Sequence, residues 1–123
     1  MLHRIKKHTV SFKHALDGII YTVTSQPNFQ FHLMATIIAF IFGLYFKIDH
    51  TEWLILFFTV NLVLASEMIN TAIESMVDLI TTERREQAKV AKDVAAGMVL
   101  VSAIMAVSVG LIIFLPKIIS LFK

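Results

Sequence analysis

The chain has 123 residues, of which 57% are hydrophobic and 16% charged, and its formal net charge is +2. A soluble domain carries roughly 25% charged residues, so this composition excludes an ordinary water-soluble protein and indicates a single membrane domain over residues 1–123. The small net charge gives no reason to expect a nucleic-acid partner, and the absence of cysteine excludes disulfides, thiolate metal sites and a cysteine nucleophile.

The first predicted element is an amphipathic helix over residues 1–24. One set of residues recurs at steps of three and four and therefore shares one helix face: Leu2, Ile5, Thr9, Phe12, Leu16, Ile19 and Val23. Most of the basic residues lie elsewhere on the helix, so we expect it to lie on the membrane surface. Packing against protein is the alternative, but the chain offers no soluble domain for it to pack on.

Three predicted transmembrane helices follow, over residues 29–46, 53–80 and 92–115. Each approaches or exceeds the length that crosses a hydrocarbon core of roughly 30 Å. Pro27 suits the first turn of the first span, and Pro116 is expected to end the last. The predicted fold class is an all-α membrane protein, with an N-terminal surface helix and three spans.

The basic residues predict the orientation of these spans. Cations cluster before the first span and between the second and third: Arg4, Lys6, Lys7, Lys13, Arg84, Arg85, Lys89 and Lys92. Only Lys47 lies in the intervening hairpin, and Lys117 and Lys123 lie at the far end. The positive-inside rule therefore places the N-terminus and the second loop in the cytoplasm and the C-terminus outside the cytoplasmic membrane.

A polar stripe lies in the second span. Three acids and one amide follow one another at steps of three, four and four: Glu67, Asn70, Glu74 and Asp78. This spacing puts them on one helix face over about 16 Å, with Glu67 deepest in the membrane. A carboxylate at the membrane centre costs roughly 2.5–3.5 kcal/mol, so the acids need a cation, a metal ion or protonation. The stripe is either a functional site or a polar lock between helices, and intramembrane ionisable groups favour the site.

The sequence Ala91-Lys92-Asp93 stands where the last span enters the membrane. Because the chain reverses between the last two spans, Lys92 and Asp93 return to the level of Glu74 and Asp78. Carboxylates beside a lysine suit a magnesium–phosphate complex, since oxygen ligands hold the ion and the cation faces the phosphate oxygens. The four glycines allow no Gly-rich nucleotide loop, so ATP would bind by another route.

Two motifs together resemble the signature of the bacterial membrane diacylglycerol kinase family. They are residues 67–74 (EMINTAIE) with Val77-Asp78, and residues 91–97 (AKDVAAG). The helix plan matches as well, and the resemblance covers nearly the whole chain from Lys13 onward. It implies a homotrimer in the inner membrane that transfers the γ-phosphate of MgATP to the hydroxyl of a lipid alcohol. Undecaprenol is favoured over diacylglycerol, because the motifs are more similar to the Gram-positive branch, for which undecaprenol is typical.

The resemblance also implies roles for individual residues. Glu67 is expected to be the general base that accepts the proton of the lipid hydroxyl, with Asn70 to position the base or the phosphate. Mg²⁺ is assigned to Glu74, and the phosphates to Lys92. The remaining nucleotide positions are Asp78, Asp93, Lys7, His14, Glu83, Arg84 and Arg85. The lipid positions are Asn28, Phe29, Gln30, Phe31, His32, Trp53 and Ala96.

Three positions depart from the family pattern. Gln26 stands where family members carry a second metal-binding glutamate, and its amide oxygen is a weaker ligand than a carboxylate. His14 replaces a tyrosine, and Gln30 replaces a basic residue.

Two other functions stay open from the residues alone. A small cation or proton transporter would load and release cations at Glu67 and Glu74. A helical scaffold would use the stripe only for polar contacts that hold helices together. The acids cluster at one end of the span, which argues against a transporter, and a lock does not explain Lys92 and Asp93. We therefore expect an ATP-dependent lipid kinase.

Overall fold

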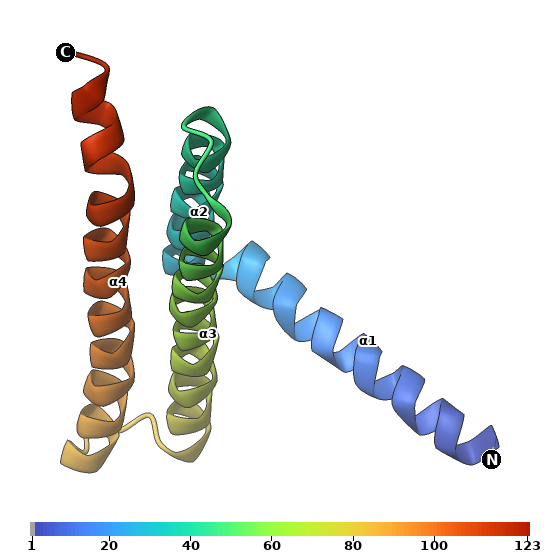
Figure 1. Cartoon of the computed structure of the whole chain (residues 1–123). Helices are drawn as coiled ribbons and strands as arrows, with labels where there is room; N and C mark the ends of the chain where they lie inside the picture. The colour runs from blue at the N-terminus through green and yellow to red at the C-terminus, as the bar shows by residue number, and fades with distance from the viewer. Residues whose placement is uncertain (1) are drawn as a thin grey trace.

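The computed structural model describes the backbone of residues 2–123 and the side chains of residues 11–123. All regular elements in this part are helices: α1 (Leu2–Ser25), α2 (Pro27–Tyr45), α3 (His50–Ile80) and α4 (Glu86–Ser120). Three of them run side by side, and α1 leaves the bundle at an angle (Figure 1). Because α2, α3 and α4 are long and apolar enough to cross a membrane, the predicted all-α fold class with three spanning helices is confirmed.

The break between α1 and α2 comes from Pro27, which occupies the first turn of α2 after Gln26 as the N-cap. The side chain of Gln30 donates a hydrogen bond of 2.9 Å to the carbonyl of Val23 and so ties the two helices together. Residues 11–21 of α1 are all exposed, and the apolar side chain of Phe12 is 74% exposed. An uncovered apolar stripe of this kind suits the boundary between headgroups and acyl chains.

The start of α3 lies at His50, three residues before the predicted start at Trp53. Asp49 accepts a hydrogen bond of 2.8 Å from the backbone N–H of Glu52, whose carboxylate accepts one of 2.9 Å from the N–H of Asp49. This capping box satisfies two N–H groups that have no partner within the helix. Asp49 and Glu52, which follow the hairpin residue Lys47, therefore cap the start of α3.

The start of α4 lies at Glu86, six residues before the predicted start at Lys92. The connecting loop is correspondingly short, over residues 81–85. An acid in the first turn complements the helix dipole, and Lys89 forms an ion pair with Asp93 one turn on. These local interactions extend the helix into the predicted loop.

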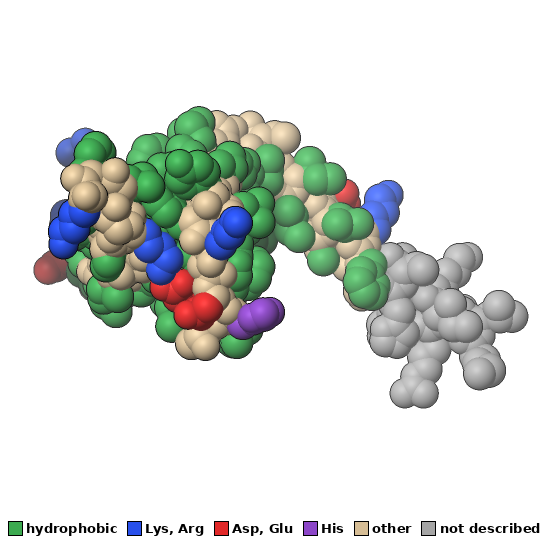
Figure 2. Space-filling model, turned by 45° about the horizontal axis from the view of Figure 1, so that its top comes forward, with side chains coloured by type: hydrophobic (Ala, Val, Ile, Leu, Met, Phe, Trp, Pro, Cys, Tyr) green, Lys and Arg blue, Asp and Glu red, His purple; other side chains and the backbone are tan. Residues whose placement is uncertain are grey.

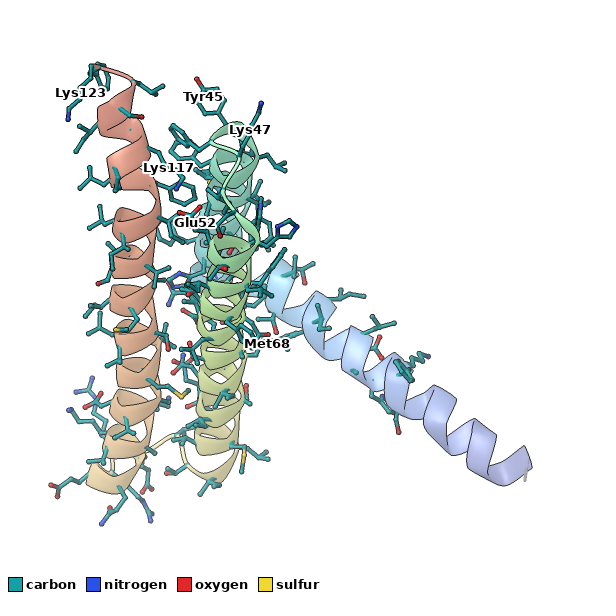
Figure 3. All side chains as sticks on the ribbon, in the orientation of Figure 1. Tyr45, Lys47, Glu52, Met68, Lys117 and Lys123 are labelled. Carbon is teal, nitrogen blue, oxygen red and sulfur yellow. The ribbon has the colours of Figure 1, made fainter. Side chains whose placement is uncertain are left out.

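The end of α4 lies at Ser120, and the predicted stop at Pro116 is wrong. Proline removes one backbone N–H from the helix. In a membrane, however, free backbone groups are costly, and spanning helices commonly continue through proline. The continuation carries Lys117 to α3, where its ammonium group pairs with the carboxylate of Glu52 (Figure 3).

The bundle is organised around α3, against which both α2 and α4 pack. At the end near the α2–α3 hairpin, Gly43 of α2 lies under the indole ring of Trp53. A Cβ at Gly43 would stand 2.7 Å and 2.9 Å from two atoms of that ring, so only glycine fits. Hydrophobic side chains cover most of the visible surface of the bundle (Figure 2).

Candidate active site

The polar stripe of α3 runs from the bundle interior to its open end. Glu67 is 3% exposed and Asn70 is 7% exposed, because both face the neighbouring helices. One turn further Glu74 is half-buried, and Asp78 is exposed. The stripe therefore joins a buried carboxylate to the surface around the α3–α4 loop.

His32 of α2 is the partner of Glu67. Its Nε2 atom lies 3.4 Å from Oε1 of Glu67, and the two side chains are 18% and 4% exposed. Among the side chains of residues 11–123, no second ion pair or hydrogen bond reaches the Glu67 carboxylate. The contact thus fixes a buried acid at one place between α2 and α3.

The next turn of the stripe contains a buried side-chain oxygen, Oδ1 of Asn70, that has no hydrogen-bond donor among the described residues. Asn70 donates a hydrogen bond of 3.0 Å from Nδ2 to Oε1 of Glu74. Its other polar atom, Oδ1, is buried and lacks a partner among the described residues. A buried carbonyl oxygen without a donor is costly, so it offers a place for a donor or a cation from a ligand.

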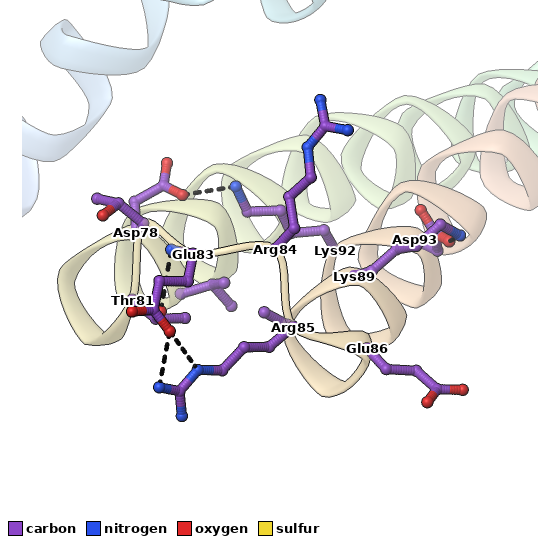
Figure 4. Close-up of a pocket in the computed structure, with 12 residues that line it drawn as sticks. Asp78, Thr81, Glu83, Arg84, Arg85, Glu86, Lys89, Lys92 and Asp93 are labelled. Carbon is purple, nitrogen blue, oxygen red and sulfur yellow. Dashed lines mark hydrogen bonds and ion pairs between the residues drawn. The ribbon is translucent and has the colours of Figure 1, made fainter.

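Lys92 of α4 lies beside Asp78 of α3, and the two side chains form an ion pair (Figure 4). This proximity follows from the chain reversal, as the sequence predicts. Lys92 forms no ion pair with Glu74, one turn away. Both partners are partly exposed, at 39% and 62%, so an incoming phosphate can replace the carboxylate at modest cost.

A cavity of about 550 Å³ opens between the α3–α4 loop and the first turns of α4. This volume is in the range of small-ligand sites. Its polar lining includes Asp78, Glu83, Arg84, Arg85, Lys89, Lys92 and Asp93. Three of these cations are paired, Arg85 with Glu83, Lys89 with Asp93 and Lys92 with Asp78. Arg84 forms no ion pair within residues 11–123, and its guanidinium projects away from the loop (Figure 4).

Other predicted site residues lie apart from this group. The side chain of Lys7 is outside the described residues, and His14 is exposed on α1, which leads away from the bundle. Gln26 makes no side-chain capping hydrogen bond, and Glu74 accepts its hydrogen bond from Asn70. Trp53 lies fourteen residues from Glu67 along α3, or about 21 Å, and packs on Gly43 instead.

The residues predicted to contact the lipid differ in how exposed they are. Asn28, Phe31 and Ala96 are exposed, Phe29 is buried, and Gln30 is bonded to α1. His32 is the one that contacts a stripe residue. The sequence prediction missed this pairing. Counting outward from the hairpin along two antiparallel helices brings His32 only to within about one turn of Glu67.

The arrangement can perform a proton transfer next to a phosphate site. Glu67 can accept a proton inside the helix bundle, and the cations around Lys92 can hold phosphate oxygens. Asn70 and Glu74 lie between these two regions.

Comparisons with known proteins bear on what this site does. A family model described as prokaryotic diacylglycerol kinase matches residues 13–114. An undecaprenol kinase of Bacillus subtilis is 45% identical over 107 residues, which are 87% of each chain. A diacylglycerol kinase of Synechocystis is 39% identical over 113 residues, 91% of this chain and 65% of the relative. A diacylglycerol kinase of Escherichia coli K12 is 32% identical over 83 residues, 68% of each chain.

Proposed function

Because this chain belongs to the prokaryotic diacylglycerol kinase family, we propose that it transfers the γ-phosphate of ATP to the hydroxyl of undecaprenol. That it is a membrane lipid kinase follows from the family and from the names of its relatives. The transporter alternative is not supported, since each of these relatives is a kinase. The choice of undecaprenol rests on the Bacillus relative, which is more similar to this chain than the two diacylglycerol kinases above.

The observation that carries the proposal is the buried Glu67 carboxylate in contact with His32. Glu67 is the general base: it accepts the proton of the lipid hydroxyl as that oxygen attacks the γ-phosphorus. The bond between the γ-phosphorus and the bridging oxygen breaks, and ADP leaves. Phosphoryl transfer depends mainly on positioning and charge stabilisation, so one proton acceptor is sufficient.

The nucleotide binds in the cavity beside the α3–α4 loop. Lys92, Arg84 and Arg85 bind phosphate oxygens there. Between turnovers Asp78 holds Lys92 in place, and Glu83 holds Arg85. From this cavity the triphosphate extends along α3 towards Glu74 and Asn70. The γ-phosphate then approaches the lipid hydroxyl held near Glu67.

Mg²⁺ accompanies ATP in this proposal, and the residues present fit it. Glu74 supplies a carboxylate, and the Asn70 Oδ1 atom, which is buried and has no partner among residues 11–123, supplies a second oxygen one turn away. Mg²⁺ in kinases is commonly held by one or two carboxylates together with phosphates and water. When bound, the ion neutralises charge on the phosphate oxygens. Gln26 would join only as a weak ligand.

We further propose that three copies assemble and that the α3–α4 loop faces the cytoplasm, where ATP is available. The resemblance to the family is what suggests three copies. On the face of α3 opposite the stripe, Leu54, Phe58 and Leu62 are 59%, 75% and 54% exposed, so this face is open to lipid chains or to other copies. The concentration of cations near the loop supports the orientation. Chemical cross-linking in membranes tests the first, and cysteine labelling from either side of the membrane tests the second.

Side-by-side phosphorylation of two lipids tests the substrate. Purified protein in mixed micelles receives Mg²⁺ and ATP labelled in the γ-phosphate, with either undecaprenol or diacylglycerol. We expect label in both products and a higher kcat/KM for undecaprenol. Faster phosphorylation of diacylglycerol would contradict the substrate assignment, and no labelled lipid from either would contradict the function.

A further inference from the structure

The turn between α1 and α2 decides where α1 points. Residues 11–21 of α1 are all exposed, whereas Thr22 is 3% exposed. Burial of the described part of α1 therefore begins at Thr22, and the rest of the helix leads away from the bundle (Figure 1). We call residues 22–30 the elbow. The interactions that hold the elbow set the direction of α1.

Pro27 leaves one backbone carbonyl of the elbow without its usual donor. In an α-helix the carbonyl of residue 23 accepts from the N–H of residue 27, and proline has no N–H. Two other carbonyls of the elbow keep backbone donors: the N–H of Gln26 donates to Thr22 at 3.1 Å, and the N–H of Gln30 donates to Gln26 at 3.0 Å. The gap in the backbone hydrogen bonds thus lies at Val23.

The side chain of Gln30 fills this gap. Its Nε2 atom donates to the carbonyl of Val23 at 2.9 Å, seven residues back along the chain. The hydroxyls of Thr24 and Ser25 donate to carbonyls within α1. Among the described side chains, Gln30 is therefore the one whose hydrogen bond crosses from α2 to α1. A carbonyl without a donor is costly where lipid replaces water, so this bond holds the elbow in one geometry.

The same turn of α2 carries the partner of the buried acid. Phe29 precedes Gln30 and is 4% exposed, so this turn is packed against its neighbours. His32 follows two residues later, and its Nε2 atom lies 3.4 Å from the carboxylate of Glu67. A helical turn moves as a unit, because backbone hydrogen bonds link each residue to the next turn. One chain of contacts thus runs from α1 to α3 through a single turn of α2.

We infer that Gln30 is a positioning residue. By replacing the N–H that Pro27 lacks, it fixes the direction of α1 and holds His32 beside Glu67. This inference rests on the proposed function, since that function makes Glu67 the base. Gln30 then acts on the reaction without touching the lipid, in contrast to the lipid contact that the family resemblance implies for this position. Because the apolar stripe of α1 suits the membrane surface, the elbow also links the placement of that helix to the acid.

Three variants test the inference by kinetics. Gln30→Met keeps the length of the side chain and removes the donor, and Gln30→Arg keeps an N–H donor. Thr24→Val is the matched control, because it removes a hydrogen bond of 2.7 Å to a carbonyl that lies within α1. The rate of phosphate transfer from labelled ATP is measured with ATP and undecaprenol varied separately.

We expect Gln30→Met to lower kcat about fivefold, with the KM for ATP and the KM for the lipid within about twofold of the wild type. A factor of about five corresponds to about 1 kcal/mol, which is the net contribution of a typical hydrogen bond. Gln30→Arg and Thr24→Val keep kcat within about twofold of the wild type. A lost lipid contact would instead raise the KM for the lipid and leave kcat unchanged.

A distance measurement tests the direction of α1 independently of activity. The sequence contains no cysteine, so Asp17→Cys and Leu62→Cys, at exposed positions of α1 and α3, can carry a unique pair of spin labels. Labelled protein in lipid bilayers is diluted with unlabelled protein, so that distances within one chain are measured. We expect one narrow distance in this background and with Thr24→Val or Gln30→Arg, and a broader or shifted distribution with Gln30→Met.

An unchanged kcat or an unchanged distance distribution in Gln30→Met would overturn the inference, and so would a raised KM for the lipid at an unchanged kcat. A loss of activity in Gln30→Arg equal to that in Gln30→Met would also overturn it. Wild-type protein that phosphorylates neither undecaprenol nor diacylglycerol would instead overturn the proposed function, and the distance measurement would still test the elbow.

Discussion

Removing the imidazole of His32 gives the most informative perturbation of the buried acid. In His32→Ala the Glu67 side chain, 4% exposed, loses the polar partner that lies 3.4 Å from it. Leaving a buried polar group without its partner costs about 1–3 kcal/mol. The 3.4 Å separation is long for such a contact, so the lower half of this range applies, and about 1.5 kcal/mol corresponds to roughly a tenfold fall in kcat/KM.

The assay is the initial rate of phosphate transfer from labelled ATP to the lipid, with lipid and ATP varied separately. We expect kcat to fall for His32→Ala with an unchanged KM for ATP, because the nucleotide cavity lies at the other end of the stripe. His32→Gln retains an N–H donor and should recover most of the rate, which a purely structural role would not explain. His50→Ala, at an exposed histidine near the hairpin, is the matched control. Wild-type kcat in His32→Ala, or no recovery in His32→Gln at equal thermal stability, would refute the role of His32 as a positioning residue.

Three further predictions concern the nucleotide, the metal ion and the packing. Lys92→Ala is expected to raise the KM for ATP about tenfold with little loss of stability, because its pair with Asp78 is partly exposed; kinetics and thermal unfolding in detergent measure the two effects, and an unchanged KM would remove the phosphate role. Gln26→Glu is expected to increase the apparent affinity for Mg²⁺, since a carboxylate binds the ion better than an amide, and a Mg²⁺ titration of activity that does not shift would separate this position from the metal. Gly43→Ala is expected to lower the free energy of unfolding by about 1–3 kcal/mol, because the new Cβ would stand 2.7 Å from the Trp53 ring; Gly43→Ala with Trp53→Leu should recover part of it, and a fully stable single variant would contradict the packing.

The sequence predicted the elements that depend on hydrophobic length and periodicity. Three spanning helices, the helix before them and the approach of Lys92 to Asp78 follow from apolar runs and from one chain reversal. Helix ends were less predictable, because they depend on local interactions. The capping box at Asp49 lay within a segment that also reads as a polar hairpin, and Pro116 ends helices in water but not here.

The candidate site could be predicted within α3 but not between helices. The steps between Glu67, Asn70 and Glu74 fix their common face, because helix geometry sets it. The pairing of His32 with Glu67 depends on the length of the α2–α3 hairpin and on where each helix begins. A cavity of about 460 Å³ between α2, α3 and α4 depends on small residues of α4 lying opposite α2, which no single segment of sequence reveals.

Glu67→Gln tests the central claim most directly, because it removes the proton acceptor and keeps the shape of the side chain. We expect lipid phosphorylation to fall by about 10²–10⁴-fold, the usual contribution of a general base. Binding of a labelled ATP analogue should stay within about twofold of the wild type, since the nucleotide cavity does not include this residue. Glu52→Gln, at the opposite end of α3, should retain activity. Undiminished phosphorylation by Glu67→Gln would contradict the assignment of the base and, with it, the account of this site.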